Sequence, residues 1–64
     1  MDYLSFSDEL KRLIRKRLND LADLLAQGGC QDYAQYKEVV GQITGLAEAE
    51  ALLLHLRSSF DQEQ

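Results

Sequence analysis

The sequence predicts an all-α protein: a single domain over residues 1–64 that forms an antiparallel two-helix hairpin and assembles into a four-helix bundle or a higher homo-oligomer. Two long segments carry apolar residues at steps of three and four, the spacing of amphipathic helices. One glycine-containing break separates them, and the chain has no proline. A chain this short buries only about 60% of its unfolded surface, so it usually needs a cross-link, a metal or a partner.

One cysteine and one histidine exclude the usual cross-links. The single thiol, Cys30, has no second cysteine in the chain with which to form a disulfide. A structural zinc site takes about four ligands in paired spacing, which one Cys and one His do not supply. We therefore expect no metal and no cofactor, and association with other chains is the expected source of additional stability.

The first helix is expected over about residues 8–27. It starts near Ser5 or Ser7, because either hydroxyl accepts hydrogen bonds from free backbone amides. Gly28 ends it, since glycine adopts the left-handed conformation at little cost, and a turn over residues 28–31 follows. The apolar stripe of this helix consists of Leu10, Leu13, Ile14, Leu18, Leu21, Leu24 and Leu25.

The second helix is expected over about residues 33–57. Asp32 and Gln35 form an Asp-x-x-Gln capping box at its start. Residues 1–4 and 59–64 are expected to fray, the latter as an acidic tail with little to bury. The line expected to face the first helix consists of Tyr36, Val40, Ile43, Ala47 and Leu54, flanked by Tyr33, Val39, Leu46 and Ala51.

The opposite side of the second helix predicts an oligomer interface, which Gly41, Gly45, Leu52 and Leu56 form or border. The Gly-x-x-x-Gly spacing lets another backbone approach closely, and each buried leucine stabilises an interface by about 1.5 to 3 kcal/mol. Alternatively, each glycine only weakens the helix, by about 1 kcal/mol relative to alanine. A homodimer in the form of a four-helix bundle is the simplest closed assembly.

The first helix carries five cations in seven successive positions, the densest charge feature of the chain. Arg12, Arg15 and Lys16 share an exposed face and are the candidate contact with a polar partner. That partner is an acidic protein surface or, less expected at a net charge of −4, nucleic acid. The alternative is a solvated face with ion pairs from Asp8 to Arg12 and from Lys16 to Asp20.

No arrangement of residues points to catalysis. His55 and Cys30 fall at opposite ends of the predicted hairpin, so neither activates the other. Glu48 and Glu50 are two positions apart, and their side chains therefore project about 200° from one another on a helix instead of converging as an acid and base pair. We expect a protein that is not an enzyme.

The charge is unevenly divided along the chain. Residues 1–27 carry five basic and five acidic groups, which sum to zero, whereas residues 28–64 carry two basic and six acidic groups, which sum to −4. Opposite charges can therefore attract between the two halves or between copies. The chain has no run of about 18 apolar residues and no basic-then-apolar secretory signal, so we expect a cytoplasmic protein without a membrane partner.

The stretch from Asp32 to Leu46, DYAQYKEVVGQITGL, follows a basic, leucine-rich first helix and a Gly-Gly turn. In these elements, over about residues 8–56, the chain resembles short α-helical hairpin proteins encoded among the virion-assembly genes of tailed bacteriophages. The resemblance implies a non-enzymatic protein of the host cytoplasm or the virion that associates with capsid, portal or packaging components. It carries over no functional residues.

Two alternatives stay open. In architecture alone the chain is similar to plasmid repressor-of-primer proteins, helical hairpins that dimerise into a four-helix bundle and bind paired RNA loops. This similarity implies a small nucleic-acid-binding bundle that uses the basic faces of two copies. The other alternative, an inhibitor that mimics nucleic acid, requires Glu38, Glu48 and Glu50 to lie along one exposed side, and Glu50 falls close to the apolar stripe.

Overall fold

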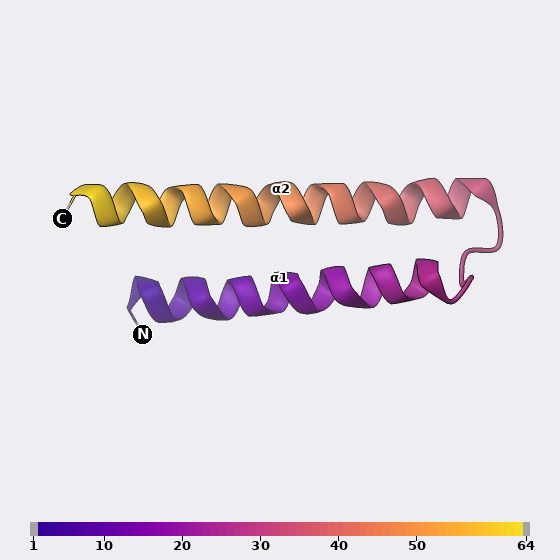
Figure 1. Cartoon of the computed structure of the whole chain (residues 1–64), viewed down its shortest axis with the longest axis horizontal. Helices are drawn as coiled ribbons and strands as arrows, with labels where there is room; N and C mark the ends of the chain where they lie inside the picture. The colour runs from indigo at the N-terminus through magenta and orange to yellow at the C-terminus, as the bar shows by residue number, and fades with distance from the viewer. Residues whose placement is uncertain (1, 64) are drawn as a thin grey trace.

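Two antiparallel α-helices lie side by side in the computed structural model, which describes residues 2–63 (Figure 1). Helix α1 spans Tyr3–Ala26 and helix α2 spans Tyr33–Glu63, and the described residues contain no strand. The rod measures 49 × 17 × 14 Å. The start of α1 and the end of α2 lie at one end of it, which we call the open end, and the connection lies at the other, the loop end. The predicted all-α helical hairpin is confirmed.

Helix α1 begins earlier than expected, at Tyr3 instead of near Ser5 or Ser7. Asp2 is the N-cap, and its Oδ1 accepts a hydrogen bond from the Ser5 backbone N–H at 2.8 Å. An aspartate caps a helix as well as a serine does, because its carboxylate satisfies one of the free amides and suits the positive end of the helix dipole. The first residue of the segment expected to fray lies outside the described residues, and the rest of that segment from Tyr3 is helical.

Helix α2 continues to Glu63, past the predicted end near residue 57, so most of the tail that was expected to fray is helical. Its final residue lies outside the described residues. Two contacts to α1 hold this last stretch. The rings of Tyr3 and Phe60 lie 5.2 Å apart, and the Tyr3 hydroxyl donates a hydrogen bond to Asp61 Oδ1 at 3.2 Å. Tertiary packing of an aromatic pair therefore extends the helix beyond the point where local sequence signals end.

Two glycines determine the path of the connection between the helices. Gly28 has a φ of +69°, as expected for the residue that ends α1. The backbone N–H of Gly28 donates to Leu25 O at 3.1 Å, and the N–H of Gly29 donates to Leu24 O at 2.9 Å. A Cβ at Gly29 would collide with the Leu24 side chain, so the chain turns closely around the end of α1.

The predicted cap of α2 is present. Asp32 Oδ1 accepts a hydrogen bond from the Gln35 backbone N–H at 2.8 Å. The Gln35 side chain reaches back, and its Oε1 accepts from the N–H of Gln31 at 2.8 Å, one residue before the position that a standard capping box uses. The two bonds together fix the direction in which α2 leaves the turn.

The core between the helices is small. Leu24 and Leu25 of the predicted stripe are half-buried, whereas Leu10 and Leu13 are 38% and 48% exposed. Ser7 is also buried, and its Oγ donates to Leu4 O at 3.1 Å. Among the described side chains, the buried apolar ones are Ile14, Leu18, Leu21 and Val39.

The line of α2 that faces α1 differs from the predicted one. Tyr36, Ala47 and Leu54 are exposed, and only Val40 and Ile43 of that line are half-buried. The covered residues alternate steps of four and three, the spacing of a two-stranded coiled coil. Two residues of this covered line are charged, so a pattern of apolar residues alone does not identify it. Its members are Val39, Ile43, Leu46, Glu50, Leu53 and Arg57.

Candidate interaction surfaces

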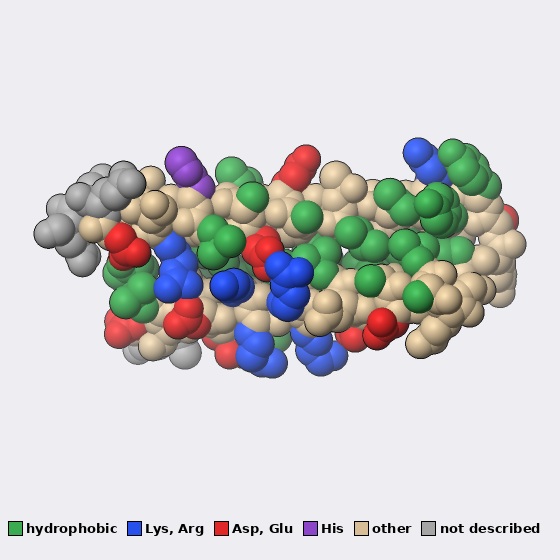
Figure 2. All heavy atoms as spheres, in the orientation of Figure 1, with side chains coloured by type: hydrophobic (Ala, Val, Ile, Leu, Met, Phe, Trp, Pro, Cys, Tyr) green, Lys and Arg blue, Asp and Glu red, His purple; other side chains and the backbone are tan. Residues whose placement is uncertain are grey.

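Ion pairs connect the helices along one face of the hairpin. Arg15 Nη2 donates to Glu50 Oε1 at 2.5 Å, and Arg57 Nη1 donates to Asp8 Oδ1 at 2.7 Å. Figure 2 shows this face: charged side chains gather along it toward the open end, and hydrophobic side chains gather along it toward the loop end. Because each pair joins a residue of α1 to one of α2, the two pairs fix the register of the helices.

The three cations predicted to contact a polar partner already have carboxylate partners. Arg12 binds Glu9 through two nitrogens, with Nη2–Oε1 at 2.5 Å and Nε–Oε2 at 3.1 Å. The predicted pair between Lys16 and Asp20 is confirmed, with Nζ–Oδ2 at 3.2 Å. Arg15 forms the interhelix pair described above. The structure therefore spreads these cations over three separate ion pairs.

The predicted pair between Asp8 and Arg12 is wrong. Asp8 pairs with Arg57 of α2 instead. Arg12 pairs with Glu9 through two parallel hydrogen bonds. This contact lowers the pKa of Glu9 and raises that of Arg12, in both cases chiefly through the hydrogen bond between the two side chains. The pair is exposed, so it orders the first turns of α1 without adding to the core.

An apolar groove lies on another face at the open end, and we call it the open-end groove. Its volume is about 250 Å³, and a second apolar hollow beside it extends along α1. Leu13 and Arg15 are two positions apart on α1, so the groove and the Arg15 ion pair project about 200° from one another. We include the second hollow in the open-end groove. Tyr3, Ser7, Glu9 and Arg57 also belong to its lining. The other lining residues are apolar: Phe6, Leu10, Leu13, Leu53, Leu56 and Phe60.

The residues predicted to form or border the oligomer interface do not share one groove. Leu56 lines the open-end groove, and Leu52, which is 70% exposed, lies one turn from it on α2. Gly41 and Gly45 are exposed, and a Cβ built on either meets nothing within 4 Å. The glycines therefore lie on open helix surface outside the groove.

Three apolar residues of the open-end groove, Phe6, Leu53 and Phe60, lie outside the lines that the sequence predicts. Phe60 falls in the tail expected to fray, and Phe6 falls before residue 8, near which the first helix was expected to begin. Leu53 lies between Leu52 of the predicted oligomer interface and Leu54 of the line predicted to face the first helix, and it belongs to neither set. The available signal is the step of three or four that relates Phe6 to Leu10 and Leu53 to Leu56 and Phe60 once both helices are extended.

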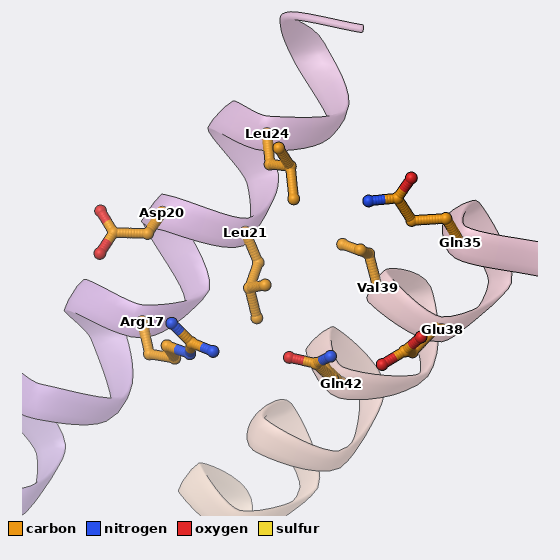
Figure 3. A pocket seen from close by; sticks show the side chains of 8 residues that line it. All are labelled: Arg17, Asp20, Leu21, Leu24, Gln35, Glu38, Val39 and Gln42. Carbon is orange, nitrogen blue, oxygen red and sulfur yellow. The ribbon is translucent and has the colours of Figure 1, made fainter. Parts of the chain in front are cut away.

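The same side of the hairpin is polar toward the loop end. A shallow groove of about 380 Å³ lies there, with Leu21, Leu24 and Val39 between the helices (Figure 3). Arg17 and Gln42 extend into the gap from opposite helices, whereas the Asp20 carboxylate points away from α2. Polar side chains surround the apolar floor: Arg17, Asp20, Gln35, Glu38 and Gln42.

The reactive side chains stay apart. Cys30 is half-buried in the connection, and His55 is exposed on α2. The α2 residues nearest the connection lie about 33 Å along the helix axis from His55 at 1.5 Å per residue. Among the described residues, no group of three or more His, Cys, Asp or Glu side chains is placed to hold a metal ion.

Helix α2 is long and apolar enough, by length and composition alone, to cross a membrane, over Tyr33–Asp61. The chain was expected to have no such segment. Glu48 and Glu50 lie in the middle of this stretch, and a carboxylate at the centre of a bilayer costs about 2.5 to 3.5 kcal/mol. Glu50 instead pairs with Arg15 of α1. In this fold one side of α2 therefore packs against α1, and that side carries the charged Glu50.

Comparisons with protein-family models, with curated proteins and with solved structures find no match to this chain.

Proposed function

We propose that this chain is a non-enzymatic protein-interaction module that associates with itself. The observation that carries the proposal is the imbalance between covered and uncovered apolar side chains. Phe6 is 62% exposed and Leu56 is 55% exposed, although both are large and apolar. Four apolar residues of the described chain are buried: Ile14, Leu18, Leu21 and Val39. Covering each large apolar side chain contributes about 1.5 to 3 kcal/mol, so association stabilises a fold that has little core of its own.

The proposed setting is the assembly of a tailed bacteriophage, in the host cytoplasm or the virion. The resemblance of residues 8–56 to hairpin proteins of virion-assembly genes supports this setting. The module would contact a capsid, portal or packaging component as well as its own copies. Arg12, Arg15 and Lys16 are the candidate polar contact, and they would exchange their intramolecular carboxylates for those of the partner.

The separation of the reactive side chains supports a non-enzymatic role. A nucleophile needs a base within hydrogen-bond reach. Cys30 lies at the loop end, whereas His55 lies toward the open end on α2. The distance between these two regions leaves the thiol without an activating imidazole.

The second candidate function is nucleic-acid binding by the basic face of α1. Its support is the cluster of cations on one helix, but Arg12, Arg15 and Lys16 each contact a carboxylate. A phosphate would have to compete with those contacts. Binding of this kind falls steeply with salt, so retention of labelled DNA or RNA that disappears at moderate salt and in Arg15→Glu would favour this function. No retention at low salt removes it.

Light scattering of the purified chain tests the proposed function. A single copy has a mass of 7.3 kDa. We expect the molar mass to rise to a fixed multiple of this value as concentration increases from low micromolar to near millimolar. A constant 7.3 kDa overturns the proposal. Flotation of the chain with lipid vesicles, together with loss of the water-soluble oligomer, overturns it in favour of a membrane partner.

A further inference from the structure

The side of the hairpin that carries the open-end groove changes character along its length. Toward the open end the lining is mostly apolar, with Phe6 and Leu10 from α1 and Leu56 and Phe60 from α2. Arg57 also lines this part, and its charge is paired with Asp8. Toward the loop end the lining is mostly polar and includes Arg17, Asp20 and Glu38. An apolar partner surface therefore fits one half of this side and not the other.

We propose that the open-end groove binds the same groove of a second copy, with the two hairpins antiparallel and overlapping only at their open ends. The two loop ends then point in opposite directions. This inference rests on the proposed self-association and adds its surface and its arrangement. A two-fold axis perpendicular to the rods relates the copies, so each groove meets an identical one.

The exposed area of the groove suits a second copy. Phe6 is 62% exposed, Leu13 is 48%, Leu56 is 55% and Phe60 is 43%. With Leu10, these residues expose on the order of 500 Å² of mainly apolar surface, whereas a stable interface buries about 800 Å² per partner, rim included. The groove thus supplies the apolar centre of a small interface. The charged Glu9, at the edge of the second hollow, belongs to the polar rim.

Charge and polarity select the staggered arrangement over two full-length alternatives. If the hairpins lay parallel, the loop-end half would meet its own copy. The lining of that half contains Arg17, Asp20 and Glu38, so three charged groups of each copy, two carboxylates and one cation, would lose water. If the hairpins lay antiparallel along their whole length, Phe6 would face these charged residues. The staggered arrangement joins apolar to apolar surface and leaves the charged half in water.

The single thiol of the chain reports the arrangement directly. Cys30 lies in the connection at the loop end, so a nitroxide attached to it marks that end of each copy. At 1.5 Å per residue along α1, the staggered dimer places the two Cys30 positions about 65 Å apart. A fully overlapped antiparallel dimer places them close to the 49 Å length of one hairpin. A parallel dimer places them side by side.

Pulsed electron paramagnetic resonance on the labelled wild-type chain, above its association concentration, measures this distance. A distribution centred near 65 Å supports the inference. A centre near 49 Å, or a distance short enough for the two thiols to form a disulfide, overturns it.

Two leucines of α2 provide a matched pair of variants. Leu56 lines the open-end groove and is 55% exposed, whereas Leu54 is 40% exposed and is absent from the groove lining. We expect Leu56→Lys to return the chain to the mass of one copy and Leu54→Lys to leave association unchanged, with the helix content of both variants intact. Equal effects of the two variants overturn the inference. A wild-type chain that never exceeds 7.3 kDa overturns the proposed function itself, so the two failures are distinguishable.

Discussion

Arg15 and Glu50 form an ion pair in the middle of the interface between the two helices. The Glu50 side chain is 13% exposed and the Arg15 side chain is 55% exposed. Glu50 Oε1 accepts from Arg15, but the buried Oε2 has no hydrogen-bond partner among the described residues. Glu50 lies between Leu46 and Leu53 on the line of α2 that faces α1. One position of a small apolar interface is thus occupied by a half-satisfied carboxylate, which fixes register at a cost in stability.

Replacement of Glu50 by leucine is expected to stabilise the hairpin. Glu50→Leu completes the apolar line, and it removes the desolvation of a carboxylate, so we expect the free energy of unfolding to rise by about 1 kcal/mol. Arg15→Ala is expected to lower it by about 1 kcal/mol, because Glu50 stays covered without its partner. Urea denaturation of the three proteins, followed by circular dichroism at one concentration, measures both changes.

Arg12→Ala is the control for this series. Arg12 pairs with Glu9 within one exposed turn of α1, where solvent screens the two charges, so Arg12→Ala should destabilise the hairpin much less than Arg15→Ala. If Arg12→Ala destabilises as much as Arg15→Ala, or if Glu50→Leu destabilises, the Glu50 carboxylate does not reduce the stability of the interface.

The glycines are expected to respond in opposite directions to alanine. Gly28 has a positive φ, so Gly28→Ala should destabilise the hairpin by about 1 to 2 kcal/mol. Gly45 is inside α2 with nothing near an added Cβ, so Gly45→Ala should stabilise it by about 1 kcal/mol. Thermal unfolding measures both effects. Association should survive Gly45→Ala, and its loss would show instead that the glycine pair is a contact between copies.

Acid is expected to weaken the start of α1. The pKa of Asp2 is lowered from its ordinary value in the folded chain, chiefly because its carboxylate accepts a hydrogen bond from the Ser5 backbone. The pKa of Glu9 is lowered in the same direction by Arg12. Because both folded pKa values are depressed, the stabilisation is complete above the unfolded values and disappears as the pH falls through the folded ones.

Titration of helix content by circular dichroism from neutral pH to about pH 2 tests this dependence. Asp2→Asn keeps a capping side chain but removes its titration, so part of the acid loss should vanish in this variant. An acid profile of Asp2→Asn identical to that of the wild type would contradict a role for the Asp2 carboxylate.

Local chemistry predicts much of this fold. The glycine turn, the Gly28 stop and the Asp32 cap depend on residues a few positions apart, and the sequence predicts all three correctly. The sequence does not predict the line of α2 that faces α1. Glu50 and Arg57 occupy covered positions of this line, whereas the pattern of apolar residues assigns them to the surface. Their coverage depends on partners in α1, which only the packed hairpin supplies.

The open-end groove could not be predicted from the sequence for a related reason. Phe6 and Phe60 come together only when both helices extend to the chain ends, and the contact of Tyr3 with Phe60 that supports this extension joins residues at opposite ends of the sequence. Local signals cannot report such a contact. Leu56 is the one member of the predicted interface between copies that lines this groove.

The melting temperature as a function of protein concentration tests most directly the claim that this hairpin is stabilised by its own copies. Association that favours the folded chain makes the melting temperature depend on concentration. We expect a cooperative transition that moves to higher temperature as the wild-type concentration rises, and a transition that does not move in Leu56→Lys. A wild-type melting temperature that is the same at every concentration, with a cooperative transition, would contradict this claim.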